Sequence, residues 1–488
     1  MTSGRAFLVL GILAAVLAVG PGWREAESDD QSPLSVGDAL VQSAESAIGP
    51  SEEPAGMEPL VVHEWGTFTS FSGSDGIKLE FRPLVENDLP SFVFNRAKQT
   101  GNWLGKFSIT ALQRMETPVT YFYTPVERDV SVRVEFPKGL LTEFYPPARE
   151  IAPEFALSKD GALARLFSGV SEEGQVELKD SMIDWGTVHL IPPESLHADV
   201  ADRELAARIG RHVEQTMTPE AQRFPHYATA RETDSAIIQS RHLARNGNKY
   251  WPIPAADYFE KFLFYRGVGN FELPLTLEAG PDGRYELTNS GADEIRSLFL
   301  VSVVGEEIRF KHYDGIDGHS SLVLEQSQDV QTVDGLAAAV AKALTSEGLY
   351  EKEAWAMVNT WKLSWFGEEG TRLFYSVPAR ITDELLPLHI EPQPDELVRV
   401  LIGRLEIMTP GEEQRVLELV ARSASSRQTS DSAEAFRSPV MDDLLAMGRL
   451  AEPALVRAKN VSDDEALQNE AGILLHELRR EYEQRNEG

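Results

Sequence analysis

The sequence contains no cysteine in its 488 residues. Disulfide bonds, thiolate metal sites and a lipid anchor on cysteine are therefore excluded. Positive charge is also scarce, because 46 lysines and arginines stand against 77 aspartates and glutamates, giving a net charge of -31. An acidic protein of this kind repels nucleic acids and anionic lipid headgroups. We therefore expect no nucleic-acid partner.

Local signatures of common enzyme classes are missing as well. There is no Gly-x-Ser-x-Gly nucleophile motif, no Gly-rich phosphate loop ending in Lys-Ser/Thr, and no dinucleotide-binding fingerprint. A catalytic triad whose members are distant in sequence stays open, because such a triad has no local pattern. The sequence therefore predicts no particular reaction.

One long uncharged apolar run is present, from Ala6 to Gly20, and Arg5 precedes it. It is shorter than the roughly 20 residues that span a bilayer. A basic start followed by such a run is typical of a secretory signal peptide, here residues 1–22, with an uncleaved N-terminal anchor as the alternative. We expect an exported protein, periplasmic or secreted, which touches the membrane only if residues 6–20 are retained.

The composition then divides the chain into segments. Residues 23–59 are acidic and rich in Ser, Ala and Pro, which predicts a disordered linker. Residues 60–410 are expected to form a β-rich body, with β stretches at 60–195 and 258–330, a helical insert at 196–257 and a mixed α/β part at 331–410. Residues 411–488 are expected to be helical. Capping boxes at Thr409–Glu412 and Ser462–Glu465 mark two helix starts there.

Alternation of apolar and polar residues supplies the strand predictions. In Val130–Phe136 every second residue is apolar, so Val132 and Val134 should face the core and Arg133 the solvent. The turn at Pro137–Gly139 predicts a hairpin with residues 140–145. Residues 271–278 and 284–288 should form another hairpin, and 297–304 a buried strand flanked by 307–313 and 320–325. We predict an α+β, mainly β fold: an antiparallel β-sandwich-like body with inserted helices and a small C-terminal helical region.

Three strings carry a resemblance to a known group of proteins. His63-Glu-Trp-Gly-Thr-Phe-Thr69, Met115-Glu-Thr-Pro-Val-Thr-Tyr-Phe-Tyr123 and Trp361-x-x-x-Trp365-Phe are similar to strings of an exported bacterial protein group seen in planctomycete-type genomes. The similarity covers most of residues 60–410. No activity is established for that group, so the resemblance implies export and a shared fold and assigns no site.

His63 and Glu64 are the first candidate for chemistry. A histidine beside a carboxylate is suited to proton transfer or metal binding. Adjacent residues of a strand point to opposite faces, however, so the two side chains converge only at a bulge. The motif also lacks the second histidine of a helical zinc site. Structural packing is the favoured interpretation.

A second candidate is His312, Asp314, Asp317 and His319, which lie within eight residues. Nitrogen and oxygen ligands suit zinc or another divalent metal. Asp-Gly pairs are also typical of hairpin turns, and the spacing does not fit an EF-hand. We favour a plain loop, so no cofactor is predicted and a divalent metal ion stays open.

The third candidate is the carboxylate pair Glu232 and Asp234. Paired carboxylates serve in hydrolases or as metal ligands. Among 77 acidic residues, however, such spacing carries little information, and a solvated segment is favoured.

These patterns favour a binding or interaction protein outside the cytoplasm, with a protein or carbohydrate ligand. The alternative is a metal- or carboxylate-dependent hydrolase acting on a periplasmic or extracellular polymer. A cleft that gathers histidines, carboxylates and aromatic rings would favour the hydrolase. A filled sandwich with scattered histidines would favour the binding protein.

Overall fold

The computed structural model describes residues 58–82, 89–96, 109–153, 178–197, 200–216, 224–242, 255–428 and 438–487. The predicted signal peptide and nearly all of the predicted linker lie outside these residues. From Glu58 onward the chain forms one compact unit. In the described part of that unit, no helix is both long and apolar enough to cross a bilayer.

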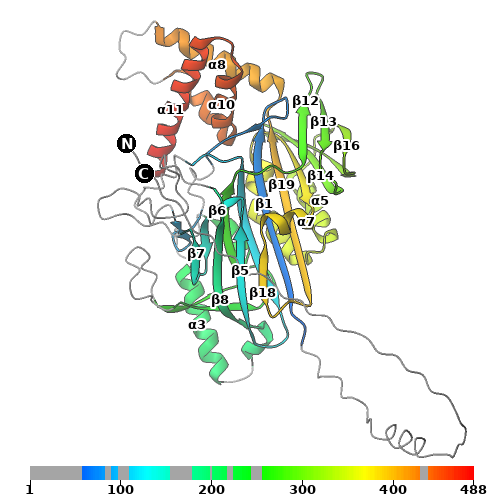
Figure 1. The fold of residues 1–488 in the computed structure, drawn as a ribbon, viewed down its shortest axis with the longest axis vertical. Helices are drawn as coiled ribbons and strands as arrows, with labels where there is room; N and C mark the ends of the chain where they lie inside the picture. Colours follow the sequence, from blue (N-terminus) through cyan, green and yellow to red (C-terminus); the bar gives the residue numbers. More distant parts are fainter. Residues whose placement is uncertain are drawn as a thin grey trace, which may run out of the picture. The chain divides into compact units, whose positions relative to one another are not determined.

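A ten-stranded sheet forms the centre of this unit. Its strands follow the order β15-β14-β17-β19-β1-β4-β11-β6-β3, and β2 pairs with β1 at the side. In that order they are β15 (Glu307–Ile316), β14 (Ile295–Val304), β17 (Gly370–Val377), β19 (Glu396–Ile407), β1 (Val61–Ser72), β4 (Gln113–Tyr123), β11 (Leu263–Gly269), β6 (Gly139–Tyr145) and β3 (Phe94–Asn95), with β2 at Lys78–Leu79. Strands β1 and β19 run parallel and side by side along their whole length (Figure 1).

Two smaller antiparallel sheets accompany the central one. The six-stranded sheet has the order β10-β9-β8-β5-β18, with β7 paired to β8. These strands are β10 (Ala256–Glu260), β9 (Ile237–His242), β8 (Ser181–Ile191), β5 (Arg128–Phe136), β18 (Leu388–Glu391) and β7 (Glu150–Ala152). The three-stranded sheet consists of β12 (Leu275–Ala279), β13 (Arg284–Asn289) and β16 (Ser320–Glu325).

The helices fall into groups along the chain. Those between the strands are η1 (Pro193–His197), α3 (Val200–Thr216), α4 (Pro225–Thr229), α5 (Val333–Ser346), α6 (Glu351–Gly367) and α7 (Ala379–Leu385). Those that follow β19 are α8 (Pro410–Gln428), α9 (Met441–Ala446), η3 (Gly448–Leu450), α10 (Ala451–Val461) and α11 (Glu465–Glu487). The mainly β, α+β fold and its C-terminal helical region are therefore as predicted.

The three largest apolar cores of the described residues hold these layers together. The first lies between the sheets, where Val132 and Val134 of β5 pack with residues such as Phe144 of β6. The second covers the other face of the central sheet and joins Trp65 to Trp365 of α6. The third joins the C-terminal helices to Phe71, at the end of β1. Because each layer buries one face against another, the body has sandwich character.

The sheet assignments differ from two of the predicted pairings. Residues 128–136 and 139–145 do not form a hairpin, because β5 joins the six-stranded sheet and β6 the ten-stranded sheet. The short turn between them carries the chain from one layer to the other. Residues 320–325 pair with β13 rather than with the strand at 295–304. The predicted hairpin of β12 and β13 is present.

Two local predictions also need correction. The expected helical insert at 196–257 contains α3 and α4, but it also contains β9, which pairs with β8. The helix predicted from Ser462 begins at Glu465, and the carboxylate of Asp464 caps it by accepting from the N–H of Ala466 at 2.8 Å. The capping box at Thr409 and Glu412 is present, with hydrogen bonds in both directions.

Candidate functional site

The structure places His63 and Glu64 on opposite faces of β1, as strand alternation predicts. His63 Nδ1 lies 2.7 Å from Glu353 Oε2 on α6. The same carboxylate accepts from the Tyr123 hydroxyl at 2.7 Å and from the N–H of Tyr350 at 2.8 Å. Burial, followed by the charge of Glu353, raises the pKa of Tyr123 far above its ordinary value, so its hydroxyl stays a donor.

The geometry of this cluster does not suit a reaction with a substrate from solution. His63 is 1% exposed and Glu353 is fully buried. His63 Nε2 is also buried and has no hydrogen-bond partner within the described part of the chain. The ring packs against Tyr350, with 4.4 Å between centroids. The Glu353–His63 pair therefore orients a histidine whose second nitrogen does not meet solvent.

Glu64 belongs to a separate buried group on the sandwich side of β1. Its carboxylate accepts from Tyr265 at 2.6 Å, from Thr120 at 3.1 Å and from Arg399 Nη2 at 2.6 Å. Arg399 also contacts Asp383 at 2.8 Å. Both oxygens of Glu64 are thus saturated by donors on neighbouring strands. This pattern stabilises the sheet and leaves no lone pair directed at a ligand.

The other predicted candidates do not gather into a site. Glu232 and Asp234 are exposed in the turn after α4, and Asp234 pairs with Lys352 at 2.6 Å. His312 lies on β15 and stacks on Phe299, with 4.4 Å between ring centroids.

The remaining members of this candidate, Asp314, Asp317 and His319, lie on a strand and in the turn that follows it. Asp314 lies on β15, and Asp317 and His319 lie in the turn that leads to β16. His319 has a positive φ of 53°, a conformation that suits a tight turn. The turn is therefore present, although the strands that it joins lie in different sheets. Within the described ranges, no three histidine, aspartate or glutamate side chains are grouped to hold a metal ion.

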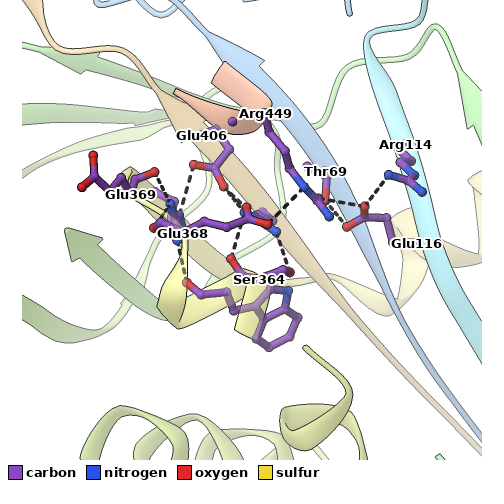
Figure 2. Close-up of polar contacts among 12 residues, drawn as sticks. Thr69, Arg114, Glu116, Ser364, Glu368, Glu369, Glu406 and Arg449 are labelled. Carbon is purple, nitrogen blue, oxygen red and sulfur yellow. Dashed lines mark hydrogen bonds and ion pairs between the residues drawn. The ribbon is translucent and has the colours of Figure 1, made fainter. Parts of the chain in front are cut away.

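A polar network that sequence reasoning missed lies at one end of the central sheet (Figure 2). We call it the Glu116 network. Its members are contributed by β1, β4, β17 and β19, by the end of α6 and by η3: Thr69, Arg114, Glu116, Ser364, Glu368, Arg372, Arg404, Glu406 and Arg449. Most of these side chains are buried, so their charges interact without much screening.

Glu116 is a buried carboxylate that two arginine side chains contact. Its Oε1 lies 3.0 Å from Arg449 and 3.2 Å from Arg114, and its Oε2 accepts from Thr69 at 2.8 Å. Burial alone would raise the pKa of Glu116, but Arg449, Arg114 and other nearby arginines lower it to about 2. Glu116 is therefore ionised throughout the physiological range.

The rest of the network attaches the end of α6 to the sheet. Arg372 donates to the backbone carbonyls of Trp365 and Glu368 at 2.7 Å and to that of Glu369 at 2.9 Å. These carbonyls lie at the C-terminal end of α6, where no N–H group of the helix is available to bond them. The helix dipole also favours a cation at this end. Glu406 accepts from Arg372 at 3.1 Å and from Arg404 at 2.6 Å.

The sequence holds a trace of this network. Arg114-Met-Glu116 and Arg404-Leu-Glu406 each place two opposite charges on one face of a strand that is rich in apolar residues. Such charges are buried only when they are paired. The pattern identifies the strands involved, but it does not show that the strands meet.

A small cavity adjoins the Glu116 network. We call it the arginine cavity; its volume is about 60 Å³. It is lined by Thr69, Phe71, Phe81, Arg82, Arg114, Glu116, Gly448, Arg449, Glu452, Pro453 and Tyr482. The lining therefore combines three guanidinium groups with two carboxylates and several apolar side chains.

An open cleft of about 520 Å³ lies on the six-stranded sheet. We call it the β18 cleft. It is lined by Ser131, Val132, Arg133, Arg149, Asp184, Gly186, Leu388, His389, Ile390, Glu391, Gln393, Pro394 and Leu397. Its floor includes an irregular register between β5 and β8, where Val132 pairs with Gly186 and Arg133 with Asp184. Bulges of this kind are common beside functional sites.

Comparisons with known proteins give no assignment. The chain matches no family model and no curated protein. Among solved structures, the Fcho1 mu homology domain of Danio rerio with bound Eps15 peptide is similar at 8% identity and a TM-score of 0.23, over 72% of this chain and 96% of that chain. The yeast delta-COP-I mu-homology domain complexed with Dsl1 WxWxV peptide gives 6% identity, a TM-score of 0.21 and the same coverage. TM-scores this low carry no argument.

Proposed function

We propose that this protein is an exported binding protein that holds an extended segment of a partner protein in the β18 cleft. The observation that carries the proposal is the position of this cleft. All four residues of β18, a strand at the end of a sheet, line it. The edge of a sheet is a surface to which an extended peptide can add by strand pairing.

The backbone of β18 has the alternation that such pairing needs. Pro387 accepts from the N–H of Glu135 at 2.9 Å, and β18 pairs antiparallel with β5. In an antiparallel ladder, the residues whose backbone groups bond to the neighbouring strand alternate. The backbone N–H and C=O groups of His389 and Glu391 therefore point towards β5, whereas those of Leu388 and Ile390 point away from it. In the described part of the chain, β18 has no strand partner besides β5.

The side chains of the cleft suit a polar peptide better than a sugar. Arg133, Arg149 and His389 supply donors, and Asp184 and Glu391 supply acceptors. None of the described residues that line the cleft is Phe, Tyr or Trp, so a sugar ring has no large aromatic face on which to stack. The cleft also lies apart from the Glu353–His63 pair, which is buried, and this arrangement does not favour a hydrolase.

Export rests on the sequence. The apolar run at 6–20 and the resemblance to exported bacterial proteins support it. Two of the strings that carry the resemblance lie on β1 and β4, which are neighbouring strands of the central sheet. N-terminal sequencing of the native protein should give a start between Val19 and Ser28. A start at Met1 in a membrane fraction would instead support an anchor.

Binding is tested by selecting peptides from a displayed random library on the full-length protein. We expect extended peptides to be enriched and to bind at least tenfold more weakly to Ile390→Pro, which removes an outward N–H while retaining the ladder with β5. Ile390→Val is the matched control, and thermal melting verifies that both variants fold.

Two other results would contradict the proposal. Enrichment of glycans on an array, with binding unaffected by Ile390→Pro, would favour a carbohydrate ligand. A stoichiometric divalent metal together with polymer hydrolysis by the purified protein would favour the hydrolase.

A further inference from the structure

We propose that the arginine cavity is a binding site for a small oxyanion, such as inorganic phosphate, sulfate or the carboxylate group of a small organic acid. The site is independent of the β18 cleft and of the peptide ligand proposed above. It lies where the C-terminal helices meet the end of the central sheet.

The positions of the guanidinium groups provide the first support. Arg114 of β4 and Arg449 of η3 both contact Oε1 of Glu116, at 3.2 and 3.0 Å. Two like charges that share one oxygen atom lie close together, which is costly in a buried site. Arg449 also lies 3.4 Å from Oε1 of Glu368, and an oxyanion in the cavity would add further acceptors beside the two guanidinium groups.

Arg82 completes the polar wall of the cavity. Its Nε lies 2.8 and 2.9 Å from the two oxygens of Glu452 on α10. Three arginines and two glutamates therefore line the cavity. Arginine is the side chain best suited to oxyanions, because its planar donors match the geometry of carboxylate and phosphate groups.

The low pKa of Glu116 indicates a positive electrostatic potential at its carboxylate. Although burial raises the pKa of a carboxyl group, the surrounding arginines hold the pKa of Glu116 at about 2. Glu116 offsets one of these charges, but the three arginines of the lining exceed its two carboxylates by one, so the wall keeps a net positive charge that favours a small anion.

Size and polarity restrict the ligand to a small one. The cavity holds about 60 Å³, whereas a single water needs roughly 10 to 15 Å³ by the same kind of measure. The space therefore accommodates a group of a few heavy atoms. Phe71, Phe81 and Pro453 form its apolar side, which limits access of water and strengthens the electrostatic interaction. Gly448, which is exposed, lines the side that faces solvent.

The test measures thermal unfolding of the full-length protein in sodium phosphate, sulfate, acetate and chloride at equal ionic strength. A ligand that binds only the folded state raises the melting temperature. We expect phosphate, sulfate or acetate to raise it by about 2 °C more than chloride near saturation. Phosphate and sulfate also stabilise folded proteins without binding, so a preference for them identifies a tetrahedral anion only if Arg449→Gln abolishes it. A preference for acetate that this variant abolishes would identify a carboxylate.

Variants connect this effect to the cavity. Arg449→Gln should weaken the affinity for the preferred anion, measured by calorimetry, by about tenfold or more, because a charged donor is lost. Arg449→Lys should retain part of the affinity. The matched control is Arg457→Gln on α10, which loses contacts to Glu413 and Asp75 but does not line the cavity.

Two results would overturn the proposal. One is an equal effect of all four sodium salts on the melting temperature of the unaltered protein. The other is an unchanged anion affinity in a folded Arg449→Gln protein. If Arg449→Gln does not fold, calorimetry on Arg449→Lys decides, and an affinity equal to that of the unaltered protein would contradict the site.

Discussion

The Glu116 network and the β18 cleft contain the same kinds of side chain in opposite surroundings. In the network, Arg404 and Glu406 are at most 2% exposed. In the cleft, the side chain of Arg133 is 48% exposed and that of Arg149 62% exposed. Both regions pair arginine with carboxylate, but only the network does so away from water.

This difference determines what each region can do. A buried ion pair cannot lose one partner without leaving an uncompensated charge, so the network fixes the positions of α6, η3 and the sheet. Exposed pairs contribute little to stability and exchange easily with solvent. The cleft can therefore give its donors and acceptors to a ligand at low cost.

The largest loss of stability is expected where a substitution buries a carboxylate that has no arginine beside it. Val134 lies on the inner face of β5, pairs with Leu388 of β18, and is 0% exposed. Val134→Asp should lower the free energy of unfolding by more than about 4 kcal/mol, or prevent folding, because the carboxylate has no compensating cation. Arg133→Asp on the outer face should change it by less than about 1 kcal/mol. Urea denaturation of both variants measures this, and equal losses would contradict the two faces assigned to β5.

The next prediction compares the loss of stability when a buried ion pair and an exposed ion pair each lose their carboxylate. Glu116→Gln removes the charge that compensates Arg449 and Arg114 and should cost about 3 to 5 kcal/mol. Glu135→Gln, which removes an exposed partner of Arg133, should cost less than about 1 kcal/mol. Chemical denaturation of the two variants makes the comparison. Similar losses would mean that burial does not distinguish the two regions.

The pH dependence of stability tests the same carboxylate. The pKa of Glu116 falls from an ordinary value of 4.5 to about 2 in the folded protein. Its contribution is therefore fully present above about pH 5 and is lost as the pH falls through 4.5 towards 2. The loss should be on the order of 3 kcal/mol. Unfolding measured from pH 6 to pH 3 should show a smaller decline in Glu116→Gln; identical slopes would be inconsistent with this role.

The smallest effect concerns the cleft itself. Arg149 contacts Asp184 at the surface, and its replacement by alanine should change the free energy of unfolding by less than about 1 kcal/mol. The same variant should weaken binding of a selected peptide, because a donor in the cleft is lost. A large loss of stability would show that Arg149 serves the fold rather than a ligand.

Local patterns in the sequence predicted local features well. The alternation in β5 correctly placed Val132 and Val134 inside and Arg133 outside, and the alternation in β1 correctly separated His63 from Glu64. The turn after Phe136 was recognised, but a turn does not show whether the strands beside it pair or enter different sheets. That choice depends on partners far along the chain, and β6 pairs with β11, more than a hundred residues later.

The polar sites could be predicted only in fragments for the same reason. Arg114 and Glu116 lie together in the sequence, but Arg449 reaches them from the C-terminal helices. His63 has its partner, Glu353, 290 residues away. The β18 cleft depends on a four-residue strand whose position at a sheet end follows from tertiary pairing alone.

The pairing of β1 with β19 also has a consequence for the order of folding. Val61 pairs with Glu396 and Ser72 with Ile407, so the middle of the central sheet joins segments 335 residues apart. Until the ribosome has made residue 407, β1 lacks one of its two long neighbours. Contacts this distant slow folding and favour assembly after synthesis is complete. If the protein is exported as proposed above, this order of folding keeps the nascent chain in the unfolded form that a secretion channel can thread.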